Sequence, residues 1–244
     1  MTLALLSLFF STLLGGLVVL LQPTLTMSKL RLLLTFSAGY LLAITLLHLI
    51  PELFTSTVKP LHIGSFLMVG FFLQRFIESF SAGIEHGHTV TTSNHCCIKN
   101  LKMFPLLSSI TLHALLDGSI LVHSDGQHVH AHEGVVVGMM LHKFLEAFAL
   151  TSLLRGFTTS IRAQLIYLIA FSLASPLGFL LSSYLHYYLS NYGGIILLAM
   201  VTGNFLYISA TMLFEASPEH NASKVTIGIS LLGAGLATVI EFLS

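Results

Sequence analysis

Eight apolar stretches, each long enough to cross a lipid bilayer, constrain the fold of this chain more than any other feature. A membrane-spanning helix needs about 20 mostly apolar residues. The stretches cover residues 2–21, 32–50, 62–80, 103–122, 134–154, 163–185, 193–214 and 225–243. Backbone groups in lipid must be hydrogen-bonded within the protein, and a barrel would show short alternating strands instead. We therefore predict an all-α integral membrane protein with eight transmembrane helices, forming one domain over residues 1–244.

The composition supports this fold class and excludes several functions. Hydrophobic residues make up 55% of the 244 positions and charged residues 8%, whereas a soluble domain carries about 25% charged residues. The formal net charge is zero, which gives no electrostatic reason to expect nucleic acid as a partner. The G-x-x-x-x-G-K-[ST] loop of ATP-driven pumps is absent from the sequence, so no nucleotide is expected. We expect membrane lipids and metal ions as the partners.

Basic residues predict the orientation of the chain. Only Lys59 lies on one side of the predicted spans, while Arg75 and Lys143 lie within them. The seven others fall on the opposite side and are Lys29, Arg31, Lys99, Lys102, Arg155, Arg162 and Lys224. Lysine and arginine accumulate in cytosolic loops. We therefore expect both termini outside the cytosol, in a plasma membrane or inner cell membrane.

Two histidine–carboxylate pairs stand in the fourth and fifth apolar stretches. His113 precedes Asp117 by four residues, and His142 precedes Glu146 by four, so each pair shares one helical face. A charged side chain at the bilayer centre costs roughly 2.5–3.5 kcal/mol on insertion scales, and such residues usually have a function. Two imidazoles and two carboxylates can coordinate Zn²⁺ or a similar divalent ion. We predict that these four residues bind a metal ion.

Lys143 offers an alternative to a metal site, because it follows His142 directly. Its ammonium could neutralise one carboxylate while the two histidines hydrogen-bond between helices. That alternative leaves the other carboxylate unpaired and does not explain the spacing of each histidine from its carboxylate, so we favour metal binding. Gly134 and Gly138 begin the fifth stretch, and small residues at this spacing allow close helix contact. We expect them to bring the fourth and fifth helices together.

Other polar residues within the spans are candidates for an ion path. His48 and Glu52 stand at the outer end of the second stretch, where we expect the proline at position 51 to stop the helix. Asn204 stands in the seventh stretch and could bind metal, although a hydrogen bond across helices is the simpler role. Lys143 completes the set of path candidates. Arg75 and Glu78 are three residues apart, and we interpret them as an ion pair on one face of the third helix.

Two loops rich in histidine flank the fourth stretch. We predict an inner loop at about residues 81–102 and an outer loop at about residues 123–133. Their histidines are His86, His88 and His95 in the inner loop and His123, His128, His130 and His132 in the outer loop. Dense histidine in a short tract is typical of metal binding. We expect metal capture by the outer loop, whereas weak metal binding and simple solvation are equal alternatives for the inner loop.

Transport fits these features better than catalysis. The H-E-x-x-H motif of zinc proteases is absent, because His132 and Glu133 are followed by Gly-Val-Val. A catalytic zinc also keeps a water ligand and usually recruits a general base. Secondary transporters, in contrast, bind their substrate near the bilayer midplane. We expect no enzymatic activity and no catalytic cofactor, with the metal ion as the substrate.

Over nearly its whole length the chain resembles the ZIP (Zrt-, Irt-like protein) family of divalent metal transporters. The resemblance rests on eight spans with outward termini, a histidine-rich inner loop and five motifs in order. These are His48-Leu-Ile-Pro51-Glu52, His113-x-x-x-Asp117-Gly118, Leu141-His142-Lys143-x-x-Glu146-Ala147, Ser175-Pro176-Leu177-Gly178 and Gly203-Asn204-Phe205-Leu206-Tyr207.

The resemblance implies import of Zn²⁺, and in some members of Fe²⁺, Mn²⁺ or Cd²⁺, into the cytosol. It also implies alternating access of an elevator kind, two three-helix inverted repeats around a central helix pair, and often a homodimer. By position, His113, Asp117, His142 and Glu146 are the ligands of the transport site. His48 corresponds to a position on the entrance pathway.

This chain departs from the family members that bind a second metal ion. Those members use asparagine after the span-four histidine, aspartate after the span-five histidine and glutamate before the span-six proline. Here the three positions hold Ala114, Lys143 and Ser175. The ammonium of Lys143 would stand where the second ion sits, so we expect a site for one ion. Asn204 stands where the family more often has threonine.

Two alternatives belong to other functional classes. A cation-diffusion exporter also uses H-x-x-x-D within a span, but that family typically has six spans and a soluble domain. An intramembrane zinc hydrolase would need an open coordination position and a substrate cleft, and the sequence does not exclude either.

Overall fold

The fold is a bundle of long helices, known from a computed structural model that describes residues 2–21, 27–81, 103–121, 133–188, 191–215 and 224–243. Within these ranges there is no strand, and eight helical spans are long and apolar enough to cross a membrane. The elements are α1 (Thr2–Leu21), α2 (Met27–Ile44), η1 (Thr45–Leu49), α3 (Ile50–Thr55), α4 (Pro60–Ser81), α6 (Met103–Gly118), η3 (Ser119–Leu121), α7 (Glu133–Phe157), α8 (Ile161–Tyr188), α9 (Asn191–Glu215) and α10 (Lys224–Leu243). The predicted all-α multi-pass class is confirmed.

The second span is longer than predicted, because its helix continues through Pro51 to Thr55. The expected stop at Pro51 is therefore wrong. The residues before it, Thr45–Leu49, form a π-helical turn in which the amide of Ile50 donates to the carbonyl oxygen of Thr45. In a regular α-helix the proline ring would meet the carbonyl four residues earlier, and the wider π turn relieves that clash.

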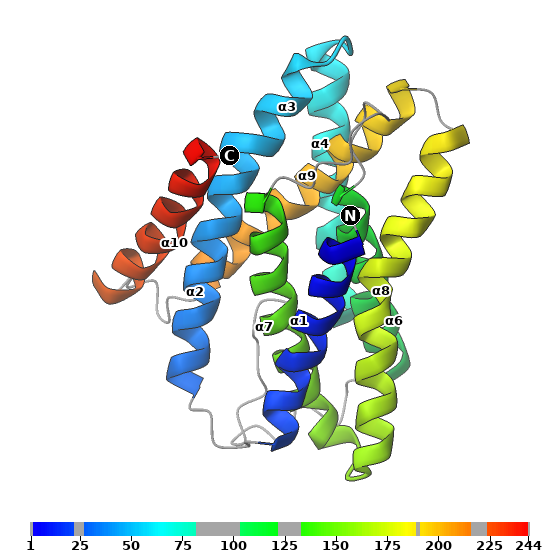
Figure 1. Ribbon diagram of the computed structural model, residues 1–244, viewed down its shortest axis with the longest axis vertical. Coiled ribbons are helices and arrows are strands. Elements are labelled where there is room, and N and C mark those ends of the chain that lie inside the picture. Colours follow the sequence, from blue (N-terminus) through cyan, green and yellow to red (C-terminus); the bar gives the residue numbers. More distant parts are fainter. Residues whose placement is uncertain are drawn as a thin grey trace.

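Four helix pairs make the most extensive contacts: α1 with α7, α2 with α10, α4 with α9, and α6 with α8. Figure 1 shows α7 in the middle of the bundle, with α2 and α10 on one side and α6 and α8 on the other. Of the described spans α7 is the most buried and α10 the least. Polar side chains on α7 are therefore shielded from lipid by neighbouring helices, which is where an intramembrane charged site is least costly.

Close packing of α6 on α8 depends on two glycines. A Cβ added at Gly118 would meet the carbonyl oxygen of Ser175, and one added at Gly178 would meet that of Leu115. At each glycine the backbone of the other helix thus occupies the space where a side chain would begin. Small residues allow this close approach in membrane helix interfaces. Because Gly118 follows Asp117 directly, this contact sets the position of that carboxylate.

The glycines at the start of α7 do not bring α6 and α7 together, so that prediction is wrong. A Cβ at Gly138 would meet the ring of Tyr40 on α2, and one at Gly134 would meet Ile44. The hydroxyl of Tyr40 also donates to the carbonyl oxygen of Gly134 at 3.0 Å. The glycines join α7 to α2, while α1 and α8 each pack against α7 and α8 also packs against α6.

Candidate metal site

The four predicted metal ligands converge in the structure. His113 and Asp117 project from α6, and His142 and Glu146 project from α7. One ligand atom from each residue lies within 4.8 Å of all the others, and this is the one such cluster found among the described residues. None of the four side chains is more than 1% exposed. The i, i+4 spacing on two separate helices thus produces one buried donor set.

Several distances within the cluster are close to those between the ligands of a tetrahedrally coordinated ion. The two histidine Nε2 atoms are 3.5 Å apart, and Nε2 of His113 lies 3.2 Å from Oδ2 of Asp117 and 3.7 Å from Oε1 of Glu146. Nε2 of His142 lies 3.8 Å from the same aspartate oxygen. Ligands about 2.0–2.2 Å from a tetrahedral zinc are about 3.3–3.6 Å from one another. Small side-chain movements would therefore suffice to coordinate an ion.

Lys143 lies inside the same cluster. Its Nζ is 2.6 Å from Oδ2 of Asp117 and 2.5 Å from Oε2 of Glu146, and the side chain is fully buried. The ammonium therefore contacts both carboxylates, where the sequence suggested that it could neutralise only one. With neutral imidazoles, two carboxylates and one ammonium leave a formal charge of −1, so pairing with Lys143 does not remove the electrostatic reason to bind a cation.

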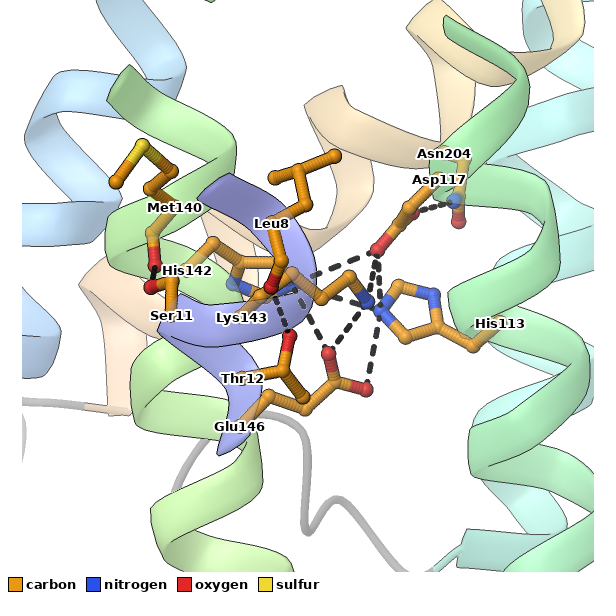
Figure 2. A network of polar contacts seen from close by, with 10 residues as sticks. All are labelled: Leu8, Ser11, Thr12, His113, Asp117, Met140, His142, Lys143, Glu146 and Asn204. Carbon is orange, nitrogen blue, oxygen red and sulfur yellow. Dashed lines mark hydrogen bonds and ion pairs between the residues drawn. The ribbon is translucent and has the colours of Figure 1, made fainter. Parts of the chain in front are cut away.

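Asn204 joins α9 to the cluster. Its Nδ2 donates to Oδ1 of Asp117 at 3.1 Å (Figure 2), and its side chain is 3% exposed. This is the cross-helix hydrogen bond that the sequence favoured for Asn204, and its partner is a candidate metal ligand. The bond occupies one oxygen of Asp117 and leaves Oδ2 directed at the two histidines. Groups that orient a metal ligand in this way strongly affect metal affinity.

Figure 2 also shows α1 beside the cluster. Thr12 donates to the backbone of its own helix at Leu8, and Ser11 donates to the carbonyl oxygen of Met140 at 2.6 Å. Both hydroxyls are thus bonded to backbone carbonyls, and α1 serves as a wall of the site.

His48 and Glu52 lie apart from the central cluster. Nδ1 of His48 is 2.6 Å from Oε1 of Glu241 on α10, and its Nε2 is 3.7 Å from Oε2 of Glu52. Glu241 was not predicted as a partner, since it is 193 residues away in the sequence and no pattern links the two positions. The pairing ties the outer half of the second span to the last helix.

Arg75 and Glu78 form the predicted ion pair, with 3.8 Å between Nη1 and Oε2. Two residues near this pair were given no partner or role from the sequence. The hydroxyl of Tyr207 on α9 donates to Glu78, and Gln74 is fully buried one turn earlier on α4. A polar residue four positions before a glutamate within an apolar span was the signal that could have identified Gln74. The seven histidines of the two loops lie outside the described residues.

No model of a known protein family matches the chain, and no curated protein matches its sequence. The resemblance to the ZIP family therefore stays a prediction based on the motifs.

Proposed function

We propose that this chain is a zinc importer of the ZIP type, which moves a divalent cation into the cytosol by alternating access. The observation that carries the proposal is the buried donor set of His113, Asp117, His142 and Glu146 inside an apolar helical bundle. Such a set is costly in a membrane without a cation to bind. Iron, manganese and cadmium are further candidate substrates, because histidine and carboxylate ligands do not select one divalent metal by affinity alone.

The pattern of helix contacts supports two inverted three-helix repeats. In chain order, the eight spans are α1, α2 with α3, α4, α6, α7, α8, α9 and α10. An inverted repeat exchanges span one with six, two with seven, three with eight and four with five. Under this exchange the α1–α7 contact becomes the α8–α6 contact. The same exchange converts the α2–α10 contact into the α9–α4 contact. All four are among the most extensive contacts in the described bundle. Repeats of this kind surround midplane sites in many secondary transporters.

A single ion at the site is supported by Lys143. Its ammonium contacts both carboxylates, so a second cation at that position would meet a positive charge in a buried environment. Anomalous diffraction from zinc-soaked crystals should show one metal per chain between α6 and α7. Two fully occupied metals there would contradict this part of the proposal.

The position of His48 near the outer end of the second span supports an entrance there, and the predicted orientation directs transport toward the cytosol. A homodimer in the plasma membrane or inner cell membrane is the assembly and location that we propose. No catalytic cofactor or enzymatic activity is part of this proposal.

Uptake of radioactive zinc into proteoliposomes tests the proposal, with a panel of metals and a pH gradient as further arms. Zinc should accumulate with the unmodified protein, and His142→Ala or Glu146→Ala should abolish uptake. His62→Ala is the matched control, because His62 is exposed and its side chain hydrogen-bonds to Tyr192, far from the four ligands in sequence. Net zinc loss from expressing cells would favour an exporter, and metal-dependent cleavage of a lipid or peptide would favour a hydrolase.

A further inference from the structure

Gln74 on α4 is an unusual residue for a membrane helix. It is fully buried, and neither its carboxamide nitrogen nor its oxygen has a hydrogen-bond partner among the described residues. Leaving a buried polar group unsatisfied costs about 1–3 kcal/mol, and no water from the bilayer core can compensate. Packing alone does not explain a glutamine here, since leucine would fill a similar space without that cost.

The register of α4 against α9 places Gln74 about one turn beyond the residues of α4 that face Asn204. A Cβ at Gly70 would meet the carbonyl oxygen of Met200, and eight residues further along α4 Glu78 accepts a hydrogen bond from Tyr207. The two helices therefore run parallel, with residue numbers increasing in the same direction. A Cβ added at Gly203, directly before Asn204, would meet the backbone of Leu67 and Phe71. Gln74 therefore follows Asn204 by about one turn on the way to Glu78.

Asn204 has a free acceptor on this side of the metal site. Its Nδ2 donates a hydrogen bond to Asp117, but its Oδ1 has no hydrogen-bond partner among the described residues. A cavity of about 20 Å³ adjoins it, lined also by Leu73 on α4 and Leu116 on α6. The surface of this cavity is apolar, so it offers a water molecule no hydrogen-bond partner. The cavity thus lies between the neighbour of Asp117 on α6 and the neighbour of Gln74 on α4.

Beyond Gln74 the polar residues lead toward one end of the bundle. Glu78 follows one turn later, about 6 Å along the helix axis, and is 7% exposed. Arg75, its ion-pair partner, is 63% exposed. Asp117 and Gln74 are thus fully buried, and Glu78 is slightly more exposed than either. The predicted orientation directs this end of α4 toward the cytosol.

We propose that Asn204, Gln74, Glu78 and Tyr207 form the release path for the metal ion between the central site and the cytosolic face. The carboxamide oxygens of Asn204 and Gln74 accept the partly hydrated divalent cation as it leaves Asp117. The carboxylate of Glu78, which accepts a hydrogen bond from Tyr207, is the last negatively charged group that the ion meets before the end of α4. This path rests on the proposed transport function and assigns roles to Gln74 and Tyr207 that the central site does not need.

The test separates transport from binding and folding in one variant. Gln74→Leu should leave the zinc affinity of the central site unchanged by calorimetry, because Gln74 makes no hydrogen bond to any of the four ligands. Its thermal stability should be equal or higher, since a buried unsatisfied group is removed. The maximal rate of zinc uptake into proteoliposomes should nevertheless fall about tenfold, the effect of a barrier raised by 1.4 kcal/mol.

Two further variants and one control sharpen the result. Gln74→Asn keeps a carboxamide and should retain more uptake than Gln74→Leu. Glu78→Gln keeps an acceptor for Tyr207 and should also slow uptake. Phe72→Leu, on the exposed face of α4, should transport at the unmodified rate.

The outcomes distinguish this path from the function on which it rests. Normal uptake by folded Gln74→Leu and Glu78→Gln proteins would overturn the path and leave zinc transport intact. A lower zinc affinity in Gln74→Leu that accounts for the whole loss of uptake would also overturn it. No uptake by the unmodified protein would overturn both the path and the proposed function.

Discussion

Lys143 and Asp117 form a fully buried ion pair in which Nζ lies 2.6 Å from Oδ2. The same aspartate oxygen is 3.2 Å from Nε2 of His113, so the ammonium and a coordinated metal ion would use one oxygen. Lys143 therefore acts as a built-in competitor for the ion, and it also stabilises the two carboxylates when no ion is bound.

Replacing Lys143 with methionine should tighten zinc binding and destabilise the metal-free protein. We expect the dissociation constant to fall roughly tenfold, equivalent to about 1.4 kcal/mol, because the competing ammonium is gone. Removing one partner of a buried ion pair costs about 3–5 kcal/mol, so the variant should unfold at a lower temperature until zinc is added. Calorimetry and thermal unfolding with and without zinc measure both effects. Lys59→Met, at an exposed position, should change neither, and weaker zinc binding by Lys143→Met would contradict the competition.

Replacing Asn204 with leucine should weaken zinc binding as well as transport. The variant loses the 3.1 Å hydrogen bond that orients Asp117, and loss of such a bond typically lowers metal affinity about 10- to 100-fold. Zinc titration of the purified protein measures the change. Thr202→Val is the matched control on α9, since Thr202 bonds to the carbonyl of Leu198 within its own helix. An Asn204→Leu protein with unmodified affinity would show that Asp117 is held by other groups.

Replacing Gly118 with alanine should lower stability by about 1–3 kcal/mol, the usual cost of overpacking. The new methyl group would meet the carbonyl oxygen of Ser175 and push α6 away from α8. Gly64→Ala is the opposite case, because beyond its own turn of helix no atom of the described residues lies within 4 Å of its added Cβ. Alanine there should be neutral or stabilise the helix by up to about 1 kcal/mol. Thermal unfolding in detergent compares the two, and equal stability of both variants would argue against close α6–α8 packing.

Replacing His48 with alanine should raise the zinc concentration needed for half-maximal uptake more than it lowers the maximal rate. We expect a change of about threefold to tenfold, since His48 acts before the ion reaches the central site. Its contacts include Glu241 and Glu52, and neither of these is one of the four ligands. Uptake kinetics over a range of zinc concentrations make the measurement. A lower maximal uptake rate with an unchanged half-saturating zinc concentration would argue against a role for His48 at the entrance.

The spans were predictable because burial of a helix in lipid is decided locally. Each needs a run of apolar side chains, and the predicted limits agree closely with helices such as Thr2–Leu21 and Lys224–Leu243. Pro51 shows where local rules fail. A proline usually ends a helix, but here a π turn from Thr45 to Leu49 precedes Pro51 and the helix continues.

The sequence by itself determined eight apolar spans and two faces that each carry a histidine and a carboxylate, because hydrophobic length and helical period are properties of neighbouring residues. Only the tertiary structure decided that Lys143 contacts both carboxylates, that Asn204 bonds to Asp117 and that Gln74 is fully buried. The bond between Asn204 and Asp117 joins residues 87 positions apart. Contacts of that range depend on which helices pack together and at what depth, and no local pattern specifies either.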